Sequence, residues 1–106
     1  MKIVKIEETS VLFDNGNEIW SEHEQDCCEC NYADFSQLED TGIEQEDFDE
    51  DLVFEEVEDK GFRFGNPGKM YYVPCYSCQN GYYSFDVDIY YKGKQVLTTF
   101  GEWIDG

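Results

Sequence analysis

The sequence lacks the features that would place this protein in a membrane or on nucleic acid. Its 106 residues contain no apolar run near the roughly 20 residues that a membrane-spanning helix needs. The N-terminus has neither the apolar block nor the small-residue cleavage site of a signal peptide, so we expect a cytoplasmic protein. No Lys or Arg occurs from Ile6 to Asp59, and the net charge is −18. This charge argues against direct binding of nucleic acid or of an anionic membrane.

Histidine is scarce, which limits acid–base and nucleophilic chemistry. His23 is the only histidine in the chain. On a strand it shares a face with Cys27, but four residues span about 13 Å, too far for a Cys–His catalytic pair. We therefore predict no catalytic residues, and a thiol enzyme ranks last among the functions considered.

Cysteine is the residue type with a suggestive pattern. The number of cysteines, five, is odd, which favours reduced thiols over a framework of paired disulfides. Four of them form the pairs Cys28-x-Cys30 and Cys75-x-x-Cys78. Zinc binds four thiolates in a tetrahedron, so one hypothesis is a structural zinc ion held by these two pairs. For this site Cys75 and Cys78 would have to lie on a turn, because their positions along a strand have opposite parity. The alternative to zinc is that all five cysteines are buried as small apolar side chains.

Strand patterns dominate the chain. Expected strands cover residues 2–7, 11–13, 18–20, 62–64, 70–73, 83–91 and 95–104. Asn15-Gly16 predicts a type I′ hairpin turn because both residues tolerate a positive φ. Residues 34–40 can form a short helix, which either Asp34 or Ser36 caps. The sequence therefore predicts a single domain, residues 1–106, of the α+β class: a predominantly antiparallel β-sheet built from hairpins, with one or two short helices.

The segment 83–91 has the strictest alternation of apolar and polar residues. A shift of one residue would bury two aspartates, so one face is strongly specified. We predict that the core-facing residues are Tyr83, Phe85, Val87, Ile89 and Tyr91, and that the solvent-facing ones are Ser84, Asp86 and Asp88.

The acidic segment 39–59 has no decisive periodicity. Phe48, Leu52, Val53 and Val57 fit one face of a helix, but residues 52–54 fit the start of a strand equally well. Phe48 is the only large apolar side chain between residues 44 and 51. We therefore predict that residues 44–51 form the most mobile interior stretch.

Six of the tyrosines form three adjacent pairs, at positions 71–72, 82–83 and 90–91. Alternation along a strand directs one member of each pair outward. An exposed row of tyrosines suits protein recognition, because the ring offers a large contact area at low entropic cost. The alternative is that these rings cover the sheet edges.

Two motifs carry a resemblance to a known group of proteins. Gln25–Glu29 contains Asp-Cys-Cys-Glu, and Asn80–Ser84 reads Asn-Gly-Tyr-Tyr-Ser. With Pro74-Cys75-Tyr76 between them, these motifs resemble a family of small proteins of bacteriophages and bacterial genomes that has no assigned function. The resemblance implies a phage or mobile-element context. The motif residues that we single out for interaction are Asp26, Cys27, Glu29, Asn80, Gly81, Tyr82 and Tyr83.

These observations predict a non-enzymatic protein-interaction module that binds a protein partner, with a basic protein as one candidate. The alternatives are a small domain with a structural zinc on Cys28, Cys30, Cys75 and Cys78, and an acidic mimic of DNA. Whichever function applies, polar side chains of the two motifs need hydrogen-bond partners when they are buried. We therefore expect Asp26–Cys30 and Cys75–Tyr83 to meet, either on neighbouring strands or on a strand and its adjoining turn.

Overall fold

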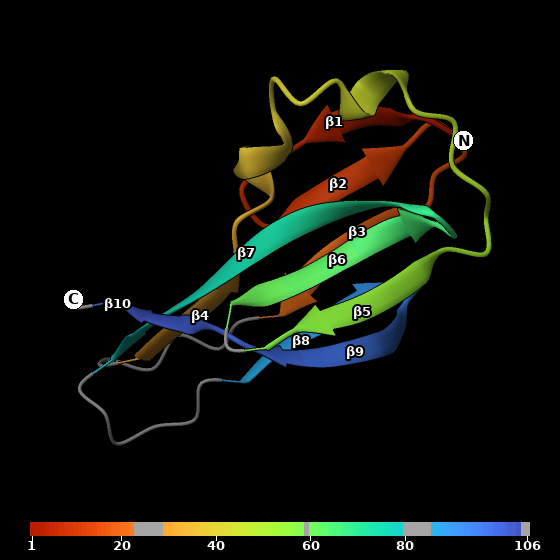
Figure 1. Ribbon diagram of the computed structural model, residues 1–106. Helices are drawn as coiled ribbons and strands as arrows, with labels where there is room; N and C mark the ends of the chain where they lie inside the picture. The colour runs from red at the N-terminus through yellow and green to blue at the C-terminus, as the bar shows by residue number, and fades with distance from the viewer. Residues whose placement is uncertain (23–28, 59, 80–85, 105–106) are drawn as a thin grey trace.

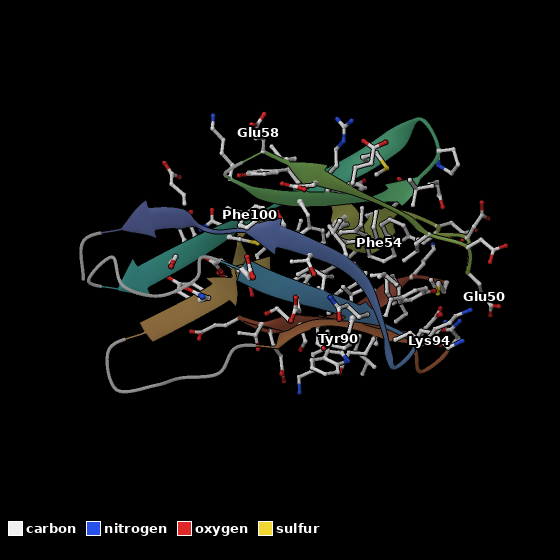
Figure 2. All side chains as sticks on the ribbon, turned by 90° about the horizontal axis from the view of Figure 1, so that it is seen from below. Glu50, Phe54, Glu58, Tyr90, Lys94 and Phe100 are labelled. Carbon is white, nitrogen blue, oxygen red and sulfur yellow. The ribbon has the colours of Figure 1, made fainter. Side chains whose placement is uncertain are left out.

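The fold consists of two β-sheets that face each other as layers (Figures 1 and 2). It is seen in a computed structural model that describes residues 1–22, 29–58, 60–79 and 86–104. The first sheet has the strand order β1-β2-β3-β8-β9. Its strands are β1 (Ile3–Ile6), β2 (Ser10–Phe13), β3 (Glu18–Glu22), β8 (Asp86–Tyr91) and β9 (Lys94–Phe100).

The second sheet is built around the long strand β7. Its strands are β4 (Glu29–Ala33), β5 (Val53–Val57), β6 (Gly61–Asn66), β7 (Lys69–Gln79) and β10 (Glu102–Ile104). The first part of β7 pairs with β6, and the last part pairs with β4 and β10. Every pairing between described strands is antiparallel except that of β10 with β7. The predicted predominantly antiparallel fold is confirmed.

The core lies between the two sheets because each strand directs alternate side chains inward. Phe54 of β5 lies between the layers in Figure 2, and its ring centroid is 5.6 Å from that of Tyr91 on β8. Val87, Ile89 and Tyr91 are buried while Asp86 is exposed, which confirms the predicted parity of this strand. Residues 83–85 lie outside the described part of the chain. The other buried side chains of the two inner faces include Val11, Phe13, Ile19, Phe62, Phe64 and Val73.

Two short 3₁₀ helices, η1 (Phe35–Leu38) and η2 (Ile43–Gln45), connect β4 to the acidic segment. The side chain of Asp34, one of the two caps expected from the sequence, caps η1 by accepting the N–H of Ser36 at 3.1 Å. In Figure 1 this yellow segment passes beside β1. Residues 39–58 form η2 and β5, so the described part of the acidic segment contains no α-helix. No helix among the described residues has the length and hydrophobicity needed to cross a membrane.

The type I′ turn predicted at Asn15-Gly16 is wrong. Gly16 has a φ of 90°, but Asn15 keeps a negative φ. The Gly16 N–H donates to the Phe13 carbonyl at 3.0 Å, and the Phe13 N–H donates to the Asn17 carbonyl at 2.8 Å. This pattern is a three-residue hairpin loop with glycine in the left-handed position. A pair of central residues with positive φ, as a type I′ turn requires, occurs instead at Lys92-Gly93, where φ is 54° and 75°.

Two further predictions, one of a strand and one of a turn, differ from the structure. The last strand, predicted over residues 95–104, breaks at Gly101, and β10 then joins the second sheet. A Cβ at Gly101 would lie 2.6 Å from the Tyr76 carbonyl carbon, so only glycine allows this close crossing. The turn expected between Pro74 and Cys78 does not form. β7 stays extended there because β4 and β10 supply partners for its backbone.

Candidate functional site

The two cysteine-bearing stretches lie on neighbouring strands. In the ladder of β4 and β7, Cys30 is directly opposite Cys78, and Glu29 is opposite Gln79. The expectation that the motifs meet is therefore confirmed for their described parts. The remaining candidate residues, Asp26, Cys27, Cys28, Asn80, Gly81, Tyr82 and Tyr83, lie outside the described residues, as does His23.

The described side chains on the inner face of this ladder are buried, and two polar ones form a hydrogen bond. The Ser77 hydroxyl donates to the Asn31 side-chain oxygen, and both residues are buried. Cys75 is fully buried beside Ala33, its partner in the register. Burial raises the pKa of the Cys75 thiol from 9.0 to about 12, so this thiol stays protonated near neutral pH.

The position of Cys75 bears on the predicted zinc site. Cys75 and Cys78 occupy positions of opposite parity on an uninterrupted strand, and Cys75 belongs to the core. A thiol must lose its proton to bind zinc, which conflicts with the environment of Cys75. Zinc on Cys28, Cys30, Cys75 and Cys78 stays a prediction, and Cys75 is the member of the set that fits least.

The outer face of β4 and β7 carries three tyrosines, Tyr32, Tyr72 and Tyr76, which we call the tyrosine face. Tyr72 and Tyr76 share the same parity along β7, and the Tyr72 side chain is 45% exposed. Tyr32 is opposite Tyr76 in the register, and their ring centroids are 5.7 Å apart. The face therefore crosses from β7 to β4 in the direction of the Cys30–Cys78 pair.

Two hydroxyl groups of the tyrosine face, those of Tyr72 and Tyr76, have a raised pKa. Burial raises the pKa of Tyr72, and electrostatic interactions with Cys75, Tyr76 and Glu102 add to this effect. Burial also raises the pKa of Tyr76, and the carboxylates of Asp34 and Glu102 add to this effect. The Tyr72 hydroxyl donates to the Lys60 carbonyl at 2.9 Å, which fixes one end of this side chain. These rings thus offer apolar area next to carboxylates.

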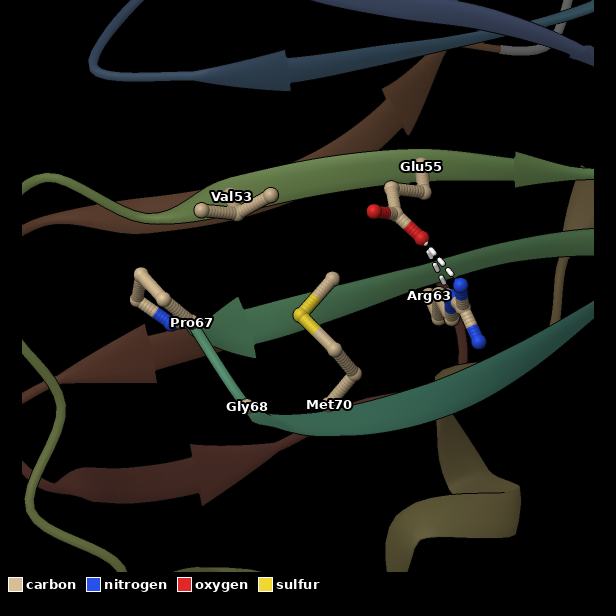
Figure 3. Close-up of a pocket in the computed structure, with 6 residues that line it drawn as sticks. All are labelled: Val53, Glu55, Arg63, Pro67, Gly68 and Met70. Carbon is tan, nitrogen blue, oxygen red and sulfur yellow. Dashed lines mark hydrogen bonds and ion pairs between the residues drawn. The ribbon is translucent and has the colours of Figure 1, made fainter.

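A shallow hollow continues the same outer face toward β5 (Figure 3). Its volume is about 560 Å³, and it is lined by Val53, Glu55, Arg63, Pro67, Gly68 and Met70. Gly65 lies between Val53 and Met70 in the register, so the middle of this row has no side chain. The Arg63 Nε donates to Glu55 Oε2 at 2.6 Å at the end nearest Tyr72, which is the register partner of Arg63.

The tyrosine pairs of the sequence divide between two faces. Tyr72 and Tyr90 point outward while Tyr71 and Tyr91 contact the core, which confirms the alternation in the two described pairs. Tyr90 belongs to the first sheet, points away from the second sheet in Figure 2 and stacks on Trp20 at 4.4 Å. The expected single row of paired tyrosines is therefore wrong for these two pairs, because Tyr72 and Tyr90 lie on opposite sides of the molecule.

The family of the chain is shown by a comparison with protein-family models. The model described as "Domain of unknown function (DUF7448)" matches residues 1–89. The chain belongs to this family. Searches of the curated proteins and of the solved structures found no match. The matched range contains all three residues of the tyrosine face and both cysteine pairs, whereas Glu102 lies beyond it. An uncharacterised family agrees with the resemblance noted above.

The sequence contained a partial signal for the tyrosine face. Tyr76 follows Tyr72 by four positions, so a continuous strand would place both on one face. The expected turn after Pro74 obscured this relation. Tyr32 had no such signal, because its neighbour across the ladder depends on how β4 pairs with β7.

Proposed function

We propose that this protein is a non-enzymatic interaction module that binds a basic protein partner through the tyrosine face. A phage or mobile-element context, implied by the motif resemblance, is part of the proposal. The observation that carries it is the gathering of Tyr32, Tyr72 and Tyr76 on one outer sheet face. Strands of one ladder hold all three rings, so little order has to be gained when a partner binds.

The chemistry of this face supports a basic protein as the partner. Tyrosine combines a rigid apolar ring with a hydroxyl and is enriched in the centres of protein interfaces. Asp34 and Glu102 act electrostatically on Tyr76, and the whole chain carries a net charge of −18. Such a field attracts a positively charged surface and speeds its association at low salt. Arginine side chains could both stack on the rings and pair with the carboxylates.

Changing two rings of the tyrosine face tests the proposal. We expect Tyr72→Ala combined with Tyr76→Ala to lower the capture of a basic protein from the source cells at least 10-fold, because interface aromatics carry most of the binding energy. Affinity capture with quantitative mass spectrometry measures this. Val96→Ala is the matched control, because Val96 is exposed on β9 of the other sheet. Circular dichroism establishes that each variant is folded.

The outcomes of this capture experiment are distinct. Equal recovery of the basic protein by the double variant and by the wild type contradicts the role of the tyrosine face. Salt-sensitive displacement of the captured protein by DNA would show that the chain occupies a nucleic-acid site, which is the DNA-mimic alternative. Capture of no basic protein by the wild type contradicts the proposal itself.

A structural zinc ion is the second candidate, and the register that opposes Cys30 to Cys78 favours it. Together with Cys28 and Cys75, these two positions make up the four thiolates that a structural zinc ion needs. Native mass spectrometry of protein produced with added zinc tests this. We expect one equivalent of zinc that is lost on Cys78→Ser. A stably folded, metal-free wild type contradicts the zinc site.

A further inference from the structure

We propose that Cys30 and Cys78 form a reversible cross-strand disulfide when the protein meets hydrogen peroxide. This redox site goes beyond the proposed binding function. It rests on the placement of the two cysteines in the ladder of β4 and β7, where five consecutive residue pairs, from Glu29–Gln79 to Ala33–Cys75, follow without a register shift.

The spacing of directly opposed strand residues suits a disulfide. Their Cα atoms lie about 4.5 to 5.5 Å apart in an antiparallel pair, and disulfides span Cα separations of about 4.4 to 6.8 Å. Tyr32 and Tyr76 are the opposed pair two positions along the same ladder face, and their rings approach to 5.7 Å. The rings of Tyr32 and Tyr76 therefore meet across the two strands. Cys30 and Cys78 occupy the equivalent positions farther along.

Cys75 is excluded as a partner by its place in the same ladder. It is opposed by Ala33, three positions from Cys78, and its side chain is fully buried in the core. A buried, protonated thiol reacts slowly with peroxide because the thiolate is the nucleophile. Cys75 thus serves as an internal control that should stay reduced.

The oxidation balances with hydrogen peroxide as the oxidant. The thiolate of one cysteine attacks a peroxide oxygen, so an S–O bond forms, the O–O bond breaks, and a sulfenic acid and water result after proton transfer. The second thiol attacks the sulfenic sulfur, which forms the S–S bond and releases a second water. Two thiols lose two electrons in total, and one peroxide gains them. Peroxide is uncharged, so the protein's net charge of −18 does not repel it. The same charge would repel glutathione disulfide, which is an anion.

The disulfide would fasten β4 to the rest of the second sheet. Among the described strands, β4 pairs only with β7. A bond between positions 30 and 78 closes a long loop of the unfolded chain, so we expect the melting temperature to rise by about 10 °C on oxidation. It would also hold Tyr32 beside Tyr76, next to the bond.

Peptide mapping after peroxide treatment tests the proposal. The full chain is incubated with EDTA and a series of peroxide concentrations, blocked with iodoacetamide, and digested without reduction for tandem mass spectrometry. We expect one linked peptide pair joining Cys30 to Cys78, two hydrogen masses lighter than the separate peptides and released by dithiothreitol. Cys30→Ser and Cys78→Ser should each abolish the link and the rise in melting temperature. A Cys27→Ser/Cys28→Ser variant should keep both.

Several results would overturn the proposal. A link from Cys78 to Cys27 or Cys28 that survives Cys30→Ser would assign the site to other cysteines. Thiols that all remain free, or that go directly to sulfinic acid, would show that Cys30 and Cys78 do not react as a pair. Where a serine variant fails to fold, the mapping of the wild type alone decides, because the linked residues are read from its fragments. A failure here leaves the tyrosine-face experiment unaffected, since that experiment uses no cysteine change.

Discussion

Replacing Phe48 with alanine is expected to destabilise the protein by about 3–5 kcal/mol, the usual cost of removing a buried phenylalanine ring. Phe48 is only 2% exposed although it belongs to the acidic segment. Its ring centroid lies 5.7 Å from that of Phe13 and 5.8 Å from that of Tyr71, which belong to different sheets. The substitution therefore opens a cavity where both layers and the segment meet. A loss of this size is a large part of the roughly 5–15 kcal/mol by which domains are stable.

Urea denaturation followed by tryptophan fluorescence measures this loss. Glu44→Ala is the matched control, because Glu44 is exposed in the same segment, and its free energy of unfolding should change by less than about 0.5 kcal/mol. A loss below about 1 kcal/mol for Phe48→Ala would mean that the ring does not anchor the segment.

Hydrogen exchange on the same samples tests the separate prediction that residues 44–51 are mobile. The N–H of Phe48 donates to the Met1 carbonyl at 2.8 Å, so its exchange should quicken in the variant.

Gly61→Ala is expected to have the second-largest effect, a loss of about 3 kcal/mol from backbone strain and steric overlap. Gly61 has a φ of 147°, a conformation that side chains disfavour. A Cβ there would lie 2.2 Å from the Val73 carbonyl oxygen and 2.8 Å from the Cys75 nitrogen. These backbone atoms cannot retreat cheaply, because the Cys75 N–H donates to the Lys60 carbonyl at 2.9 Å. The clash would separate β6 from the strand that carries the tyrosine face.

The control for this substitution is Gly68→Ala. Gly68 has a φ of 87° in the turn between β6 and β7, but a Cβ there meets no atom within 4 Å. Only the left-handed backbone should cost energy, about 1–2 kcal/mol. Thermal and urea unfolding of both variants give the comparison. Equal losses for the two glycines would show that the contact with Val73 is not the cause.

Local parts of the fold follow from the sequence because their signals are local. Val87 and Ile89 alternate with Asp86 and Asp88, and burial of a charge without a partner is costly enough to decide the face. Asp34 caps η1 for an equally local reason, since its carboxylate reaches an N–H two residues away. The turn at residues 14–17 shows the limit. Asn15-Gly16 suits two hairpin loops, and the pairing of the flanking strands selects between them.

The sequence by itself determined a strand-rich single chain with an acidic surface, outward and inward faces on its clearest strands, and no α-helix signal strong enough to dominate. The tertiary structure alone decided that the strands divide into two sheets and that β7 extends past Pro74. It also decided that β4 pairs with β7, which places Tyr32 beside Tyr76 and Cys30 opposite Cys78. Such pairing joins residues more than 40 positions apart, and it depends on burial summed over both sheets, which no short stretch of residues encodes.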